Sequence, residues 1–221
     1  MRLHFVSLVL VGAFTVSLTT TAAASTIGLD PVSGGGFSST GLNSTRGFEF
    51  TVSTSLTVSA LGLFDVDADG LGEAHNVFLW TSTGTLLASA SVDSGDTAVD
   101  SAYAPADSQW LFASIAPFVL TPGTYVLGAT YAIGSPDAFL AGTHPSPISV
   151  TTASGISWVG LRQAFANDTF PNGTLPGFTG TFGPSLLVED STPVPEPASL
   201  TLLGLGLAGI GARRWRQRKA S

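Results

Sequence analysis

Cysteine is absent from the 221 residues, and charged side chains make up only 10% of them. Without cysteine, the chain has no disulfides, no thiolate metal sites and no cysteine nucleophile. The apolar fraction is 44%, which is too high for an intrinsically disordered chain. The 26 glycines and 13 prolines break helices, so they argue against a helical bundle.

Basic side chains are scarce in the central part of the chain. Residues 25–192 contain fourteen Asp and Glu but only Arg46 and Arg162, a formal charge of −12. Such an acidic segment does not neutralise phosphates, so nucleic acid is excluded as a partner. Most of the basic residues lie instead in one short run near the end of the chain, residues 213–219. This run needs a separate explanation.

The first 24 residues have the three parts of a secretory signal peptide. Arg2 gives a basic start, residues 5–18 are mostly apolar, and Ala22-Ala23-Ala24 supplies the small residues of a cleavage site. We therefore expect residues 1–24 to be removed before Ser25, and the rest of the chain to be exported.

The C-terminus combines a proline motif, an apolar segment and a basic tail. Pro195-Glu196-Pro197 is followed by uncharged residues at 198–212 and then by Arg213-Arg214-Trp215. Fifteen helical residues span about 22 Å, which is less than the ~30 Å hydrocarbon core of a bilayer. Trp215 at the interface and arginines that snorkel extend this reach. We therefore predict a transmembrane helix at about 198–212, with the basic tail in the cytoplasm.

This segment, residues 194–219, resembles the PEP-CTERM sorting signal of Gram-negative bacteria, because the Pro195-Glu196-Pro197 motif, a short Gly/Leu/Ala-rich span and an Arg-rich end follow in that order. The resemblance implies transient anchoring in the inner membrane and recognition by an exosortase. It also implies release to the cell surface or into an exopolysaccharide matrix. The same segment carries the name "ice-binding protein C-terminal domain", which we do not take as a sign of ice binding.

Residues 25–189 are expected to form one exported all-β domain, joined to the sorting signal by a linker at 190–193. The clearest pattern is a strict alternation of apolar and polar residues at 48–60, typical either of one long strand or of two strands joined by a bend. Further short strand patterns recur between Gly, Pro and Ser turns, among them Asn76–Thr81, Trp110–Ala116, Phe118–Leu120, Ile156–Leu161 and Phe178–Phe182. We therefore predict an antiparallel β-sandwich of jelly-roll type.

A candidate metal site lies in the sequence Asp65-Val66-Asp67-Ala68-Asp69-Gly70. Carboxylates at alternate positions followed by glycine are typical of the first half of a calcium loop, and Glu73 could add a fourth ligand. However, the twelfth position is Asn76 rather than glutamate, and the flanking segments have strand patterns. The alternative is a solvated acidic turn between strands, and both interpretations stay open.

No catalytic residues are predicted. The exported part has two histidines, His75 and His144, far apart in the sequence, and it has no nucleophile elbow or zinc motif. We therefore expect a non-enzymatic surface or matrix protein without a required cofactor. One alternative is a carbohydrate-binding module, either Ca²⁺-assisted or with Trp80, Trp110 and Trp158 on one exposed face. A second alternative is a secreted hydrolase.

Overall fold

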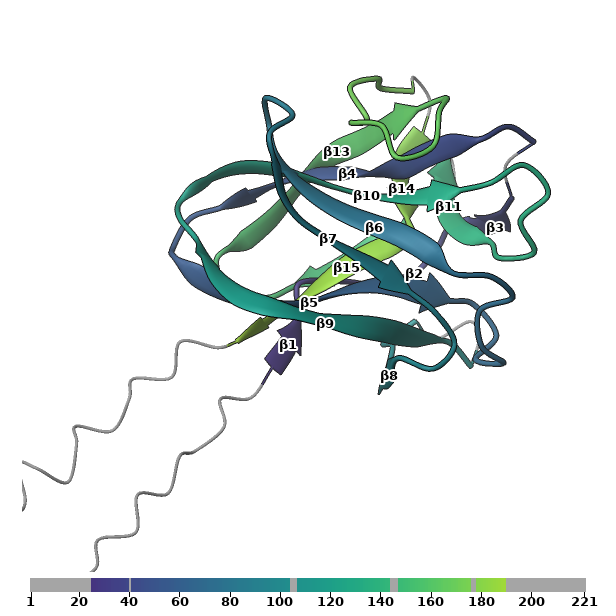
Figure 1. Cartoon of the computed structure of the whole chain (residues 1–221), viewed down its shortest axis with the longest axis horizontal. Helices are drawn as coiled ribbons and strands as arrows, with labels where there is room; N and C mark the ends of the chain where they lie inside the picture. The colour runs from purple at the N-terminus through teal and green to yellow at the C-terminus, as the bar shows by residue number, and fades with distance from the viewer. Residues whose placement is uncertain (1–24, 40, 104–106, 144–146, 176–177, 190–221) are drawn as a thin grey trace, which may run out of the picture.

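The computed structural model describes residues 25–39, 41–103, 107–143, 147–175 and 178–189. All regular structure in these residues is β-strand, and every pair of strands is antiparallel. The predicted all-β antiparallel class is therefore confirmed (Figure 1). The expected signal peptide, linker, transmembrane helix and sorting motif lie outside the described residues. In the part of the chain that the structure describes, no helix is long and apolar enough to cross a membrane.

Two five-stranded sheets make up most of the domain. The first has the strand order β1 (Ser25–Ile27), β15 (Pro184–Glu189), β5 (Leu56–Asp65), β9 (Gln109–Leu120) and β8 (Thr97–Asp100). The second has the order β13 (Ile156–Ala164), β4 (Ser44–Val52), β10 (Gly123–Tyr131), β6 (His75–Thr81) and β7 (Leu86–Val92). Neighbours in these orders are often distant in sequence, so the sheets join separate parts of the chain.

Two smaller sheets complete the fold. One contains β14 (Phe178–Phe182), β11 (Phe139–Thr143) and β3 (Gly36–Ser38), and the other pairs β12 (Ser149–Thr152) with β2 (Leu29–Ser33). The three-stranded sheet packs against the second large sheet, where the ring of Phe182 lies 5.4 Å from that of Phe48.

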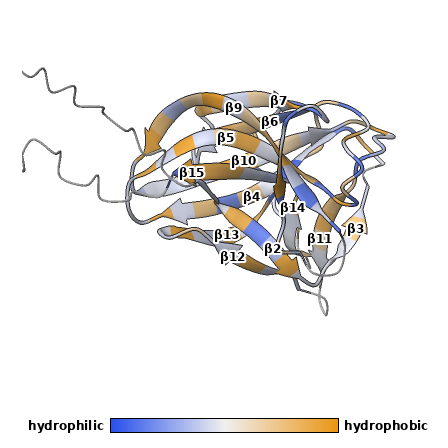
Figure 2. Ribbon diagram, turned by 90° about the horizontal axis from the view of Figure 1, so that it is seen from below, coloured by the Kyte–Doolittle hydropathy of each residue, from blue (hydrophilic) through white to orange (hydrophobic). Residues whose placement is uncertain are grey.

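The alternation at 48–60 corresponds to two strands joined by a bend. In β4, Phe48, Phe50 and Val52 are buried, while Glu49 and Thr51 are half-buried on the other face. The chain bends at residues 53–55 and continues as β5, whose second half is buried at every position. Strands of both large sheets thus contribute to one apolar core. Apolar residues run along β5, β9 and β10 in Figure 2.

The two outermost segments of the described chain lie side by side. Ser25 pairs with Glu189 and Ile27 with Leu187, so β1 is hydrogen-bonded to β15 (Figure 1). Glu189 also pairs with Thr57, near the start of β5. Asp65 ends β5 eight residues later, which at about 3.3 Å per residue is ~26 Å away. The β5–β6 loop therefore lies at the end of the domain opposite to the points where the chain enters and leaves it.

Candidate functional site

The β5–β6 loop begins at a buried carboxylate. Asp65 is the last residue of β5 and is 2% exposed. Its Oδ2 accepts hydrogen bonds from the backbone N–H of Gly70 at 3.0 Å and from Nε2 of Gln109 at 2.8 Å. Ala68 and Gly70 have φ angles of 57° and 97°, the left-handed region that glycine adopts without strain. The loop therefore turns back on Asp65 and closes around its side chain.

This closure brings the predicted aspartates together. Carboxylate oxygens of Asp65, Asp67 and Asp69 lie within 4.8 Å of one another, and Asp67 and Asp69 are exposed. They line a pocket of about 360 Å³, to which Asp137 also contributes. Glu73, the fourth predicted ligand, does not belong to this group. Calcium binding here stays a prediction, and the bonds to Asp65 fit the acidic turn equally well.

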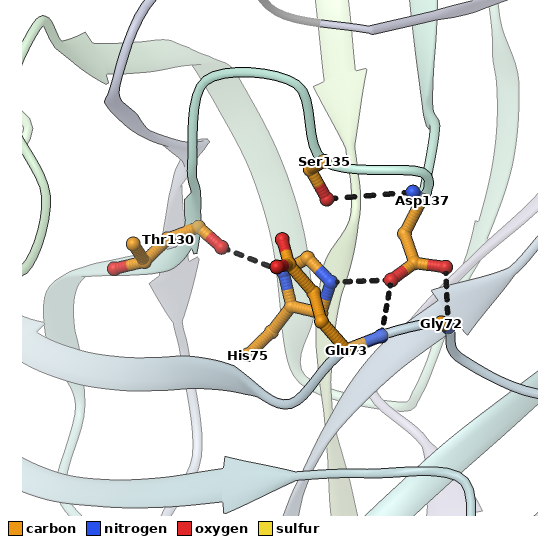
Figure 3. Close-up of polar contacts among 6 residues, drawn as sticks. All are labelled: Gly72, Glu73, His75, Thr130, Ser135 and Asp137. Carbon is orange, nitrogen blue, oxygen red and sulfur yellow. Dashed lines mark hydrogen bonds and ion pairs between the residues drawn. The ribbon is translucent and has the colours of Figure 1, made fainter.

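Glu73 lies elsewhere because the backbone before β6 is held by Asp137. Asp137 Oδ1 accepts from Gly72 N–H at 2.9 Å, and Oδ2 accepts from Glu73 N–H at 3.2 Å. The same Oδ2 lies 2.8 Å from Nε2 of His75 (Figure 3). One carboxylate thus joins the β10–β11 loop to the segment that leads into β6.

His75 is fully enclosed by this network. Its side chain is 1% exposed, and Nδ1 lies 2.7 Å from the carbonyl oxygen of Thr130 (Figure 3). A carbonyl only accepts, so Nδ1 carries a proton. Nε2 shares a hydrogen bond with the carboxylate group of Asp137. His75 and Asp137 therefore form a buried hydrogen-bonded pair, and both ring nitrogens are engaged.

Tyr131 lies beside this pair, with its ring 5.1 Å from that of His75. Its hydroxyl is buried and has no hydrogen-bond partner among the described residues. Burial raises the pKa of Tyr131 far above its usual value, and the negative charge of Asp137 raises this pKa further. A Cβ at Gly183 would collide with the hydroxyl, so the site needs glycine there.

This geometry bears on the catalytic alternative. A general base must reach a substrate proton through a free lone pair, and His75 has none while it is paired with Thr130 and Asp137. His144, the other histidine of the exported part, lies outside the described residues. Within the described part of the chain, the structure brings no histidine together with a serine and a free carboxylate.

The tryptophans do not form the exposed platform that one carbohydrate-binding alternative requires. Trp110 is 0% exposed in the core, and Trp80 is 5% exposed, with its ring against Phe170. Trp158 is half-buried and packs 6.3 Å from Phe182. The three rings therefore serve packing at separate places.

Sequence reasoning missed a second buried carboxylate, Asp30 in β2. Its Oδ1 accepts from Nε1 of Trp110 at 2.8 Å and from Oγ of Ser101 at 2.7 Å, and Oδ2 accepts from Ala102 N–H at 2.8 Å. Asp30 is 7% exposed. It fastens β2 to β9 and to the segment after β8, and no local pattern in the sequence marks it.

Comparison with known proteins identifies the C-terminal segment. Residues 193–217 match the family model of the PEP-CTERM protein-sorting motif, and the chain is therefore a protein that contains a PEP-CTERM sorting motif. Such a motif implies an exported protein that an exosortase processes after transient C-terminal anchoring in the membrane of a Gram-negative bacterium. No curated protein and no solved structure matches the chain.

Proposed function

We propose that this chain is a non-enzymatic protein of the cell surface or exopolysaccharide matrix, released from its membrane anchor by an exosortase. The observation that carries the proposal is the PEP-CTERM motif at residues 193–217, directly after a folded β-domain that ends at Glu189. Signal-peptide cleavage before Ser25 would leave β1 as the first segment of the mature protein.

We further propose that the domain is a β-sandwich of jelly-roll type. The antiparallel strands of two five-stranded sheets support this proposal, and so does the single core to which both contribute. Because core residues come from many strands, removal of the flanking segments would leave this core intact.

The position of the chain ends supports a role on the outer side of the membrane. β1 and β15 are paired, so both processing sites would emerge from the same edge of the domain. The pocket at the β5–β6 loop lies at the opposite end. While the C-terminal helix is anchored, the short linker at 190–193 would leave this pocket directed away from the bilayer.

A non-enzymatic role is supported by the surroundings of His75. The ring is buried and both nitrogens have partners, so it joins β6 to β10 and to the β10–β11 loop. The side chains that line the neighbouring pocket include four carboxylates and no basic group. Such a pocket offers acceptors for hydroxyl groups or cations, and no histidine or serine lines it that could act as a base and a nucleophile.

The proposal is tested by cell fractionation in a host that has the cognate exosortase. We expect the unmodified protein at the cell surface or in the medium, and the Glu196→Ala variant in the inner membrane with its tail uncut. Thr192→Ala, four residues earlier in the linker, is the matched control and should behave like the unmodified protein. Equal release of all three proteins would contradict processing at the motif.

A second candidate function is carbohydrate binding at the acidic pocket. It is favoured by the three aspartate carboxylates within 4.8 Å in a pocket of about 360 Å³, because carboxylates accept hydrogen bonds from sugar hydroxyls and bind cations. The test measures retention of the protein on exopolysaccharide from the producing strain. Retention that is lost in the Asp67→Asn variant and in the presence of a chelator would support Ca²⁺-assisted binding. Retention that is absent, or insensitive to both changes, would exclude it.

A further inference from the structure

Strand β7 forms one edge of the second large sheet. The sheet order is β13-β4-β10-β6-β7, so β7 pairs with β6 on one side only. Its other side shows no backbone hydrogen bond to any described segment. Ser89 and Ser91 are exposed, and Ala88 and Ala90 are half-buried even though they belong to the core side. The backbone groups along this edge therefore have no strand partner among the described residues.

The edge lacks two of the features by which proteins usually prevent such pairing, because it has neither a charge nor a proline. β7 reads Leu-Leu-Ala-Ser-Ala-Ser-Val, with no charge and no proline over seven residues. Its one bulge lies near the start of the strand, where the pairing with β6 shifts between Leu86 and Ala88. Leu86 and Leu87 there are 51% and 39% exposed.

The other edges of the two large sheets are better protected. β1 and β8 have only three and four residues. The part of β9 that extends beyond β8 contains Pro117. β13 carries the charged Arg162, and a bridge between Gln163 and Gly173 covers one of its ends. The open edge of β7 is therefore a distinctive feature of this domain.

We propose that β7 is a homodimerisation edge, on which β7 of a second copy of this chain pairs antiparallel about a two-fold axis at Ser89. The second large sheet of one copy and that of the other then form one continuous ten-stranded sheet. An axis at the middle residue of β7 gives the longest overlap, because residues 86–92 of each copy all find a partner. Residues that face each other directly in an antiparallel pair lie on the same face, so the core-side alanines Ala88 and Ala90 meet each other.

The charge distribution of this domain favours a second copy over a charged strand of another protein. In this register Asp93 lies opposite Thr85 of the second copy, and Asp96 opposite Ser82, so no two acids face each other. The domain as a whole is strongly acidic, so two copies repel each other, and this repulsion is weakest along the uncharged edge of β7. A charged peptide would find no counter-charge on β7, whereas an identical uncharged strand matches it.

The absence of cysteine makes a direct test possible. Residues that face each other in an antiparallel pair have Cα atoms about 4.5–5.5 Å apart, within the range that a disulfide spans. The full chain with Ser89→Cys, purified in detergent and mildly oxidised, is expected to form a disulfide-linked dimer that a reductant reverses. Ser157→Cys is the matched control, because Ser157 is an exposed residue of β13, at the opposite edge of the same sheet. We expect at least about tenfold less dimer from it, because its thiols meet only by random collision.

A second pair of variants tests the axis without oxidation. Ser89→Lys places two like charges opposite each other and should give a monomer in sedimentation velocity, and so should Ser89→Glu. An equimolar mixture of these two variants should again form a dimer. Equal cross-linking of Ser89→Cys and Ser157→Cys would overturn the proposal, as would a monomeric unmodified chain or cross-links only to other proteins. Processing at the C-terminus plays no part in these results, so they stand apart from the proposed function.

Discussion

Removal of the Asp30 carboxylate should destabilise the domain more than removal of any exposed acid. In Asp30→Ala, the buried indole N–H of Trp110 loses its acceptor, and Ser101 and Ala102 lose theirs. A hydrogen bond to a charged group contributes about 1.5–3 kcal/mol, and a buried donor left unpaired costs about 1–3 kcal/mol.

The three losses are unequal, because only the Trp110 donor is fully shielded from water. Ser101 is half-buried and Ala102 is exposed, so water replaces much of what they lose. We therefore expect Asp30→Ala to lower the free energy of unfolding by about 3–5 kcal/mol. Asp30→Asn keeps the acceptor for Trp110 but turns an N–H₂ group toward Ala102 N–H, and should cost about half as much.

The assay is urea unfolding followed by tryptophan fluorescence and by circular dichroism. Asp100→Ala is the control, because Asp100 is an exposed acid on β8 and its removal changes the net charge equally. We expect this control to stay within about 0.5 kcal/mol of the unmodified protein. If Asp30→Ala and Asp100→Ala unfold at the same urea concentration, the assigned role of Asp30 is wrong.

Three further predictions concern the network around the β5–β6 loop. In a double-mutant cycle of His75→Leu and Asp137→Ala, urea unfolding should give a coupling energy of about 1–3 kcal/mol, and strict additivity would contradict the buried hydrogen-bonded pair. Burial raises the native pKa of Tyr131 above its unfolded value, so its contribution to stability is complete below pH 10 and is lost as the pH rises further. Tyr131→Phe should be at least as stable as the unmodified protein at pH 7, because it removes a buried hydroxyl that has no hydrogen-bond partner among the described residues. Above pH 10 it should lose stability less steeply by about 1.4 kcal/mol per pH unit, whereas unchanged slopes would argue against burial of the hydroxyl. Asp67→Asn should raise the melting temperature slightly in chelator and low salt because it relieves like-charge repulsion, and a large Ca²⁺-dependent rise in the unmodified protein alone would identify a calcium site instead of an acidic turn.

Much of the strand framework could be predicted from the sequence. The patterns at Asn76–Thr81, Ile156–Leu161 and Phe178–Phe182 correspond to β6, β13 and β14. Two predicted apolar segments at 110–116 and 118–120 form the single strand β9, because the β5–β9 register shifts around Pro117 and the strand continues. β1, β2, β3, β8 and β11 were not predicted, because three to five residues carry too little alternation to recognise.

The polar network could not be predicted, because its partners are distant in sequence. Asp30 meets Trp110 across 80 positions, and His75 meets Asp137 across 62. The Asp-x-Asp-x-Asp-Gly spacing did identify three side chains that lie together. It failed to place Glu73, because Asp137 holds the backbone of that segment in a different position. Local spacing thus predicted a turn, whereas the contacts that fix the loop depend on the folded topology.

Intact mass of the protein recovered from the envelope and medium of the producing bacterium tests the central claim most directly. The account predicts a mature chain that begins at Ser25 and lacks everything beyond the Pro195-Glu196-Pro197 region. Recovery of protein that still carries Arg213 and the rest of the basic tail would contradict it. The C-terminus would then be a permanent anchor, and the domain would act at the inner membrane.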